Sequence, residues 1–485
     1  MPNSCAGANP STVNSPDFTQ LNRFVACAQK RFDLSLLAGC FAGTRPQPDI
    51  PARAVGLSLV LGEVVHIPSL LQLEEETKVP QWQQWAGCRH PISHDPFGYV
   101  SERLDPEQLR RAGLWIHHRL KRGKAFEANK INGLLVVSLD ANEEFCSDSR
   151  SCDDCLTRQV TCQDAEGHEF KKTRYYHKQV CAQLSGPELS VILEVEPMRQ
   201  GEEECAAALR LLRRMRQKYG PRFFDVGGVD SWYANGPFLK TAWEELGWPV
   251  LAVLKQERYE AHQEALALTP GQKPTQVVER DGRQVEIGDV RSVRFTDPYP
   301  GPVRIVRVRE RWTERKRVDR EWKTEQKEQN WIGVVAGDWD GSAGAAIRDM
   351  GHWRCKIENN AFGELTRHWH PTHCAHHHPV AVLALLWIKI IAFTLFHAFA
   401  ILHGKLFRLG KVTLQELRKQ IYRSLLCGSP MPFFSGWKTK TDKLRNAKKA
   451  WKSRPPKGSP PATLNAKLCP KPKEAGTSDA ALPPG

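Results

Sequence analysis

The sequence predicts an α/β fold in which a helical domain precedes the sheet and a β-rich segment interrupts it. Residues 134–139 form a continuous apolar run that is typical of a buried central strand, and residues 223–229 form a second hydrophobic strand. Amphipathic patterns at residues 203–219 and 237–246 indicate helices that alternate with strands, as in an α/β layer. The chain has 485 residues, of which 41% are hydrophobic, so two or three domains with their own cores are expected.

An all-α N-terminal domain is expected over residues 1–130. Residues 18–37 have helical periodicity, a second helix begins near Pro51, and residues 106–122 form an amphipathic pattern. Residues 92–98 contain proline and glycine and are expected to form a turn or a helix cap. Because no helix-turn-helix pattern is visible, DNA binding and packing alone are equally good interpretations of this domain.

The α/β core is expected in two parts, residues 131–256 and 336–403, separated by a β-rich insertion over residues 257–335. Strands of the first part are expected at residues 134–139, 174–184, 189–196, 223–229 and 249–255, with a cysteine-rich loop between the first two. An arginine run in the insertion either contacts phosphates or forms the solvated face of an edge strand. The run comprises Arg304, Arg307, Arg309 and Arg311.

The positive charge of the chain is concentrated at its C-terminal end. Of the formal net charge of +15, residues 404–485 contribute +14 (18 Lys and Arg against 4 Asp and Glu), which leaves +1 for the rest. A basic helical extension is expected over residues 404–436 and a disordered basic tail over residues 437–485. This asymmetry indicates a polyanionic partner, for which nucleic acid is favoured over an anionic membrane. The alternative is a tail that is only solvated.

One segment, residues 380–402, is apolar and long enough to span a bilayer. Lys389 lies near its centre, where a lysine costs about 2.5–3.5 kcal/mol on insertion, so a buried helix of a soluble core is favoured over a membrane anchor. Fourteen cysteines are too few for a disulfide scaffold of this length, and no export signal is visible at the N-terminus. A cytoplasmic protein with reduced thiols and no membrane is therefore expected.

Acidic residues follow two of the predicted strands and recur on a later helix. Asp140 follows residues 134–139 and Asp230 follows residues 223–229, at the strand ends where open α/β sheets place their sites. Glu358 lies one helical turn after Arg354 on an amphipathic pattern, which taken alone is also typical of an ordinary surface helix. Three such carboxylates match a two-metal phosphoryl-transfer site. Asp225 is the alternative second acid, but it is expected in mid-strand.

Two further clusters could bind metals. Cys152 and Cys155 have the two-residue spacing of a zinc site, Cys146 and Cys162 flank them, and His168 is nearby. Four thiolates would hold a structural zinc ion, and ordinary reduced thiols are the alternative. Six histidines between His368 and His378 join two predicted helices and are expected to be structural rather than metal ligands.

The segments around the three acids resemble those of the DDE transposases of bacterial insertion sequences, in the group with a β-strand insertion between the second and third acids. The matching segments are Leu139-Asp140, Val229-Asp230-Ser-Trp-Tyr233-Ala-Asn235 and Ile357-Glu358-Asn359 with Phe362. The resemblance covers residues 45–403 and implies a ribonuclease-H-like mixed sheet with helices on both faces. The chain departs from it at Gly351 and Leu365, where many relatives have tyrosine and lysine.

The resemblance implies metal-dependent DNA cleavage and strand transfer at the ends of an insertion sequence. Asp140 would bridge two Mg²⁺ or Mn²⁺ ions, with Asp230 and Glu358 each holding one. The residues implied to contact DNA phosphates are Arg354, Tyr233 and Asn235. Implied partners are double-stranded DNA, as terminal inverted repeats and target, and a second copy of the chain in a synaptic complex at the nucleoid. A non-catalytic, zinc-containing DNA-binding protein is the alternative.

Overall fold

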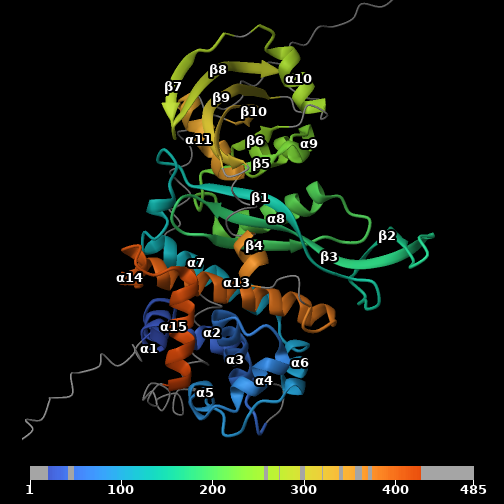
Figure 1. The fold of residues 1–485 in the computed structure, drawn as a ribbon, viewed down its shortest axis with the longest axis vertical. Helices are drawn as coiled ribbons and strands as arrows, with labels where there is room; N and C mark the ends of the chain where they lie inside the picture. The colour runs from blue at the N-terminus through green and yellow to red at the C-terminus, as the bar shows by residue number, and fades with distance from the viewer. Residues whose placement is uncertain are drawn as a thin grey trace, which may run out of the picture. The chain divides into compact units, whose positions relative to one another are not determined.

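The computed structural model describes residues 20–41, 48–255, 260–271, 273–294, 301–318, 321–337, 342–355, 363–369 and 374–427. In this part of the chain a ten-stranded mixed sheet is combined with helices (Figure 1). The predicted mixed α/β class is therefore confirmed. The predicted basic tail, residues 437–485, lies outside the described residues.

The N-terminal region is helical, as predicted. Its helices are α1 (Gln20–Phe32), α2 (Leu34–Cys40), α3 (Ala52–Val65), α4 (Leu70–Thr77), α5 (Pro80–Ala86), α6 (His94–Ser101) and α7 (Pro106–Arg122), followed by the short turn η1 (Glu127–Asn129). The helix predicted over residues 18–37 is broken at Asp33, which has a left-handed φ of 56°. Of the turn or helix cap predicted over residues 92–98, the structure has the cap, because Ser93 is the N-cap of α6. Pro96 falls in the first turn of this helix, where a missing N–H costs no helical hydrogen bond.

Five strands form the centre of the sheet in the order β4-β3-β1-β5-β6. They are β1 (Val136–Ser147), β3 (Glu169–Ser185), β4 (Val191–Pro197), β5 (Val226–Asp230) and β6 (Val250–Leu254). Strands β1, β3 and β4 pair antiparallel, whereas β5 and β6 run parallel to β1. Three antiparallel strands followed by two parallel ones make the ribonuclease-H-like arrangement that the resemblance implies.

The segment predicted as a cysteine-rich loop is mostly a strand. Strand β2 (Leu156–Gln163) pairs antiparallel with the first half of β3, so that the two form a long hairpin (Figure 1). Asp164 holds the turn, because its Oδ1 accepts hydrogen bonds from the backbone N–H groups of Glu166 and His168. The polar, largely exposed side chains of β2 gave no apolar alternation from which the strand could be predicted.

The β-rich insertion extends the central sheet. It contains α10 (Glu260–Leu268), β7 (Gln276–Arg280), β8 (Arg283–Arg294), β9 (Pro302–Val318) and β10 (Glu321–Ala336). Strand β10 pairs antiparallel with β6, and β9, β8 and β7 follow it outward. Strand β8 pairs antiparallel with β9 and has a register shift between Val290 and Val293.

Most arginines of the predicted run form ion pairs with carboxylates of neighbouring strands. Arg304 is 4% exposed and donates hydrogen bonds of 2.8 and 2.5 Å to the carboxylate of Asp289. Arg309 and Arg311, further along β9, are paired with Glu328 at 2.9 and 3.0 Å. These ion pairs give the guanidinium groups partners within the sheet. Neither phosphate contacts nor a solvated face of an edge strand is therefore needed to explain the run.

The remaining helices connect and cover the sheet. They are α8 (Glu204–Tyr219), η2 (Ser231–Tyr233), α9 (Gly236–Lys240), the π-helical turn η3 (Thr241–Glu245), α11 (Gly344–Cys355), α12 (Gly363–His368), α13 (Pro379–Leu402), α14 (Lys405–Arg408) and α15 (Leu414–Cys427). Helix α8 packs against β3 and β4, whereas α11 packs against β5, β6, β8, β9 and β10. The carboxyl ends of β1 and β5 therefore have α11 close by.

Helix α13 is the apolar segment of the sequence, and it lies among helices from the other end of the chain. By length and composition it could cross a membrane, and 78% of its most apolar window is buried inside the protein. It packs against α1, α3, α6 and α7 as well as against β4 (Figure 1). Lys389, at its middle, lies 3.7 Å from the carboxylate of Glu63 on α3, so the charge of this lysine is paired inside the helical region.

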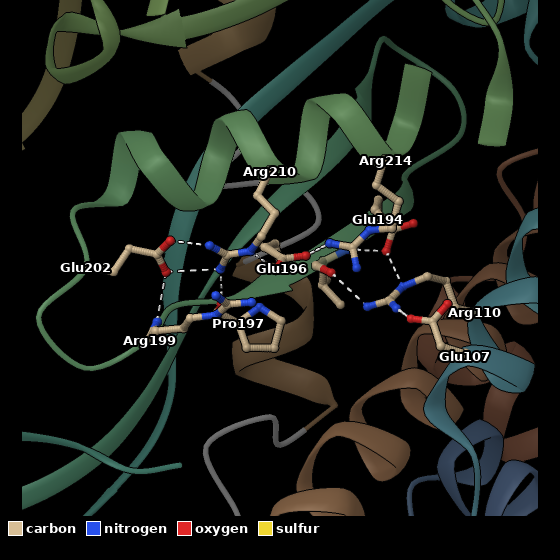
Figure 2. Close-up of polar contacts among 10 residues, drawn as sticks. Glu107, Arg110, Glu194, Glu196, Pro197, Arg199, Glu202, Arg210 and Arg214 are labelled. Atoms are coloured by element: carbon tan, nitrogen blue, oxygen red, sulfur yellow. Dashed lines mark hydrogen bonds and ion pairs between the residues drawn. The ribbon is translucent and has the colours of Figure 1, made fainter. Parts of the chain in front are cut away.

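A network of ion pairs connects α7, β4 and α8 (Figure 2). Arg110 of α7 donates a 2.8 Å hydrogen bond to Glu194 of β4, and the side chains are only 7% and 1% exposed. On the same strand, Glu196 pairs with Arg210 and Arg214 of α8. Because a buried charge without its partner is costly, these pairs fix the helical region and α8 against the edge of the sheet.

A buried carboxyl group on β1 gives the fold a predicted dependence on pH. The β1–β3 register shifts between Glu143 and Phe145, and the side chain of Glu144 is buried there. Burial raises the pKa of Glu144 to about 8, against a smaller lowering by Lys389. The folded state therefore binds this proton more tightly than the unfolded state, so its contribution to stability is complete below pH 4.5 and is lost as the pH rises toward 8.

We expect Glu144→Gln to remove this loss, which is on the order of 3 kcal/mol between pH 5 and pH 8.5. Urea unfolding of both proteins at the two pH values measures it. Glu143→Gln is the control, because Glu143 forms a surface pair with Arg158. Equal pH dependence of the wild type and Glu144→Gln would show that Glu144 does not titrate in this range.

Candidate active site

The backbone register brings Asp140 and Asp230 to the same level of the sheet. Strands β1 and β5 are parallel, with Ser138 opposite Gly228. Two residues further along both strands, Asp140 and Asp230 point to the same face because side chains alternate with a period of two. Strand β1 itself continues to Ser147, paired with β3, so the predicted strand end at residue 139 is only the end of its pairing with β5.

Arg354 of α11 joins the two acids. Its Nη2 lies 3.4 Å from the Oδ2 atoms of Asp140 and of Asp230. The Arg354 side chain is 6% exposed, whereas those of Asp140 and Asp230 are 14% and 37% exposed. The structure therefore brings together three of the residues predicted for the site, with the guanidinium below and the carboxylates open toward solvent.

Backbone hydrogen bonds orient both carboxylates. Oδ1 of Asp140 accepts a 3.0 Å bond from the N–H of Ala141, and Oδ1 of Asp230 accepts a 2.9 Å bond from the N–H of Trp232 in η2. The Oδ2 atom of each acid is thereby turned toward Arg354. Two carboxylates beside one guanidinium leave a local excess of negative charge, which favours a divalent cation.

Glycine at position 228 is required by the approach of Arg354. A Cβ at this position would lie 3.3 Å from Cγ of Arg354 and 3.2 Å from Oγ of Ser138. We expect Gly228→Ala to move the arginine away from the acids and to cost about 1–3 kcal/mol of unfolding free energy. Gly227→Ala is the matched control, because its Cβ would meet nothing closer than 3.7 Å. Urea unfolding of both variants tests this prediction, which fails if they are equally stable.

Tyr233 is placed beside the acids through a cluster that the sequence did not reveal. Its hydroxyl donates a 2.6 Å hydrogen bond to Glu204 of α8, and Nζ of Lys178 on β3 lies 2.9 Å from the same carboxylate. The pKa of Tyr233 is well above its usual value, first because it is buried and then because Glu204, Asp140 and Asp230 are near. Tyr233 is therefore a protonated donor at the edge of the acidic pair.

Asn235 has a structural position. Its side-chain oxygen accepts a 3.0 Å hydrogen bond from the N–H of Phe238 and so caps α9. The predicted phosphate contact of Asn235 stays a prediction. Trp232, which the sequence analysis did not select, is 52% exposed next to Asp230. An exposed indole at this place is suited to stacking on a nucleic-acid base.

The third predicted acid, Glu358, lies outside the described residues, since α11 ends at Cys355 and the description resumes at α12. The structure does explain both departures from the resemblance. At Gly351 a Cβ would lie 2.5 Å from the ring of Trp331 on β10, so the indole fills the space that a tyrosine side chain needs. Leu365 is 6% exposed in α12, a position that buries an apolar side chain.

The residues present fit the predicted divalent cations. Carboxylate oxygens from Asp140 and Asp230 are the hard ligands that Mg²⁺ and Mn²⁺ take, and both acids retain solvent access for water ligands and substrate. Nε and Nη2 of Arg354 are buried and have no hydrogen-bond partner within the ranges that the structure describes. Such donors can bind a phosphate oxygen that reaches the acids.

The predicted four-cysteine set is not brought together. Cys152 and Cys155 instead form a group with His177, whose ligand atoms lie within 4.8 Å of one another. Cys146 is exposed, and Cys162 lies on β2 opposite Phe170. His168 pairs with Asp164 in the hairpin turn. The signal that could have found His177 is the β2–β3 pairing, which was not predicted.

The histidines near α13 are only partly described. His376 pairs with Glu102 at 3.0 Å, and the ring of His377 meets Phe145 edge-on at 5.6 Å. His368 is exposed, whereas His370 and His373 lie outside the described residues. The described contacts agree with the structural role that was favoured for this cluster.

No protein-family model matches the chain, and no curated protein matches it. Among solved structures, the chain is similar to the piggyBac transposase in a cryo-EM structure of its synaptic complex with hairpin DNA. The TM-score is 0.41 and the sequence identity 11%, over 96% of this chain and 94% of that one.

Proposed function

We propose that the chain is a DDE-type transposase, which cleaves DNA and transfers strands at the ends of an insertion sequence. The observation that carries this proposal is the convergence of Asp140 and Asp230, from adjacent parallel strands, on the buried Arg354. An ion pair that only stabilised the fold would not require both carboxylates to remain open to solvent. Here both retain solvent access, and Nε of the guanidinium has no hydrogen-bond partner among the described residues.

In this proposal Asp140, Asp230 and Glu358 hold two Mg²⁺ or Mn²⁺ ions. Such ions, when bound, supply an activated water or 3′-hydroxyl and stabilise the leaving oxygen. The guanidinium of Arg354, whose Nε has no hydrogen-bond partner among the described residues, would bind and orient the phosphate of the scissile bond. Tyr233 would stay protonated and donate from the edge of the site, and the exposed ring of Trp232 would hold a base.

The proposed partners follow from the same chemistry. Double-stranded DNA is recognised as the terminal inverted repeats of the element and as the target, and the basic residues beyond position 403 supply phosphate affinity. Because two element ends must be joined together, the active species is proposed to be a homodimer in a synaptic complex. Its proposed location is the cytoplasm, at the nucleoid.

The deciding experiment is cleavage of DNA that carries the ends of the element, with and without Mg²⁺. Wild type and Glu358→Gln are compared, with Glu244→Gln as control because Glu244 is exposed on η3. We expect cleavage that needs both the metal and Glu358, and a control that behaves as the wild type. Cleavage by Glu358→Gln at the wild-type rate would remove this residue from the site.

The alternative function is that of a non-catalytic DNA-binding protein that contains zinc. It predicts DNA binding without cleavage at any Mg²⁺ or Mn²⁺ concentration, equally in the wild type and in Glu358→Gln. The solvent access of Asp140 and Asp230 favours the catalytic proposal.

A further inference from the structure

A group of three potential metal ligands lies at the base of the β2–β3 hairpin, apart from the acidic site. Sγ of Cys152 and Sγ of Cys155 are 3.6 Å apart, and Nε2 of His177 lies 3.1 and 3.4 Å from them. A tight turn holds the cysteines, because the N–H of Cys155 donates to the carbonyl oxygen of Cys152 at 3.1 Å. The three atoms thus converge on one point.

The spacing fits a bound metal and not a disulfide. A disulfide requires sulfur atoms about 2.05 Å apart. In a tetrahedral zinc site with Zn–S of about 2.3 Å and Zn–N of about 2.0–2.1 Å, neighbouring ligand atoms are roughly 3.5–3.8 Å apart. The observed separations of 3.1 to 3.6 Å approach this value, so these side chains need little movement to form one face of the tetrahedron.

The surroundings prepare His177 to act as a ligand. Its ring stacks on Phe145 at 5.1 Å, which fixes the direction of Nε2. Burial lowers the pKa of His177, so the imidazole is neutral and can offer a lone pair. Burial also raises the pKa of Cys152 to about 11, so the thiol ionises near neutral pH only if a cation binds beside it.

A fourth ligand is available from the segment that precedes α13. Cys374 is half-buried there, three residues before His377, and its thiol donates a 3.3 Å hydrogen bond to the carbonyl oxygen of His376. In the same segment His377 packs on the opposite edge of Phe145, and its buried Nδ1 has no hydrogen-bond partner among the described residues. His377 places the segment beside Phe145, on which His177 stacks, and Cys374 is the thiol that the segment offers.

We propose that Cys152, Cys155 and His177 bind a structural Zn²⁺ ion, with Cys374 as the fourth ligand. The site would connect the base of the hairpin to the chain leading into α13, which lies more than 200 residues later. It would thereby fix the start of α13 against β1 at Phe145. This site differs from the predicted four-cysteine set, because His177 and Cys374 replace Cys146 and Cys162.

Metal analysis of the purified full-length protein tests the site without any DNA substrate. We expect about one equivalent of zinc in the wild type, and less than about a tenth in Cys152→Ser and in His177→Gln. Cys146→Ser on β1 and Cys162→Ser on β2 are matched controls and should keep the metal. Zinc-free wild type, or full zinc in Cys152→Ser, would overturn the proposal.

The fourth ligand is tested separately with Co²⁺ in place of zinc. The thiolate-to-cobalt absorption should correspond to three thiolates in the wild type, and Cys374→Ser should lose about one third of it while still binding cobalt. Unchanged absorption would remove Cys374 from the ligand set. If the variants fail to fold, thiol titration of the wild type serves instead: removing zinc with a chelator should expose three more reactive thiols, and no increase would refute the site.

Discussion

Asp140→Asn should abolish metal-dependent DNA cleavage while leaving DNA binding intact. Loss of a group that merely orients a metal ligand costs about 10–100-fold, so loss of a direct ligand should reduce the cleavage rate by at least about 100-fold. Asparagine keeps the shape of the side chain but supplies no negative charge to the cation. Cleavage rates with Mg²⁺ and with Mn²⁺, together with gel-shift affinity for the same DNA, measure the two effects. Asp230→Asn should behave in the same way.

Asp225→Asn is the matched control for this prediction. Asp225 was the alternative second acid, but the structure places it before the first residue of β5, at the opposite end of the strand from Asp230. There its carboxylate accepts a 2.8 Å hydrogen bond from the N–H of Leu135. Asp225→Asn should therefore cleave DNA normally. Cleavage lost in Asp225→Asn and kept in Asp230→Asn would reverse the assignment.

Glu310→Gln should destabilise the protein by about 3–5 kcal/mol, because it leaves buried cations without their counter-charge. Glu310 of β9 is fully buried, with Arg283 at 2.7 Å, Arg348 at 2.8 Å and His352 at 2.5 Å. Burial alone would raise its pKa, but hydrogen bonds from His352, Arg348 and Arg283 lower the pKa to about 2. Urea unfolding at pH 7 gives the difference.

The pH dependence of the stability that Glu310 contributes gives a second test. Since the folded-state pKa of Glu310 is below the unfolded value of about 4.5, its stabilisation is present above pH 4.5 and is lost as the pH falls toward 2. Glu328→Gln is the control. Glu328 also has a pKa of about 2, through Arg309 and Arg311, but its pairs are exposed and screened. Equal destabilisation by the two substitutions would contradict the role of burial.

Glu310 also affects the candidate active site. Arg348 and His352 lie on α11, the helix that carries Arg354. Their contacts with Glu310 hold α11 against β9, and Arg354 reaches the acids from the last turn of the same helix. We therefore expect Glu310→Gln to weaken cleavage more than its stability loss alone explains.

The two strand acids could be predicted from sequence because their positions depend on local patterns. An apolar run followed by aspartate predicts the strand and places the acid where the pairing of β1 with β5 ends, although β1 itself continues to Ser147. Arg354 was found by helical spacing relative to Glu358. The sequence did not predict the roles of Glu204, Lys178 and His177. Each contacts its partners through strand pairing or helix packing, which no local sequence pattern indicates.

The departure at Gly351 also depends on a tertiary contact that the sequence does not reveal. The sequence shows only that a tyrosine is missing, whereas the structure shows the ring of Trp331 in the space. These residues are twenty positions apart and come from different elements, so their contact depends on how α11 docks on β10. Similarly, α6 and β2 were missed because proline and polar side chains conceal elements that tertiary contacts stabilise.

Because α13 is buried among α1, α3, α6 and α7, these helices can complete their core only after α13 has been synthesised. Helix α7 ends at Arg122, but the helix that completes its core ends only at Leu402, 280 residues later. At a synthesis rate of about 5–20 residues per second, the early helices wait roughly 15–55 s with their apolar faces uncovered. A ribosome that stalls before α13 would therefore release a chain prone to aggregation.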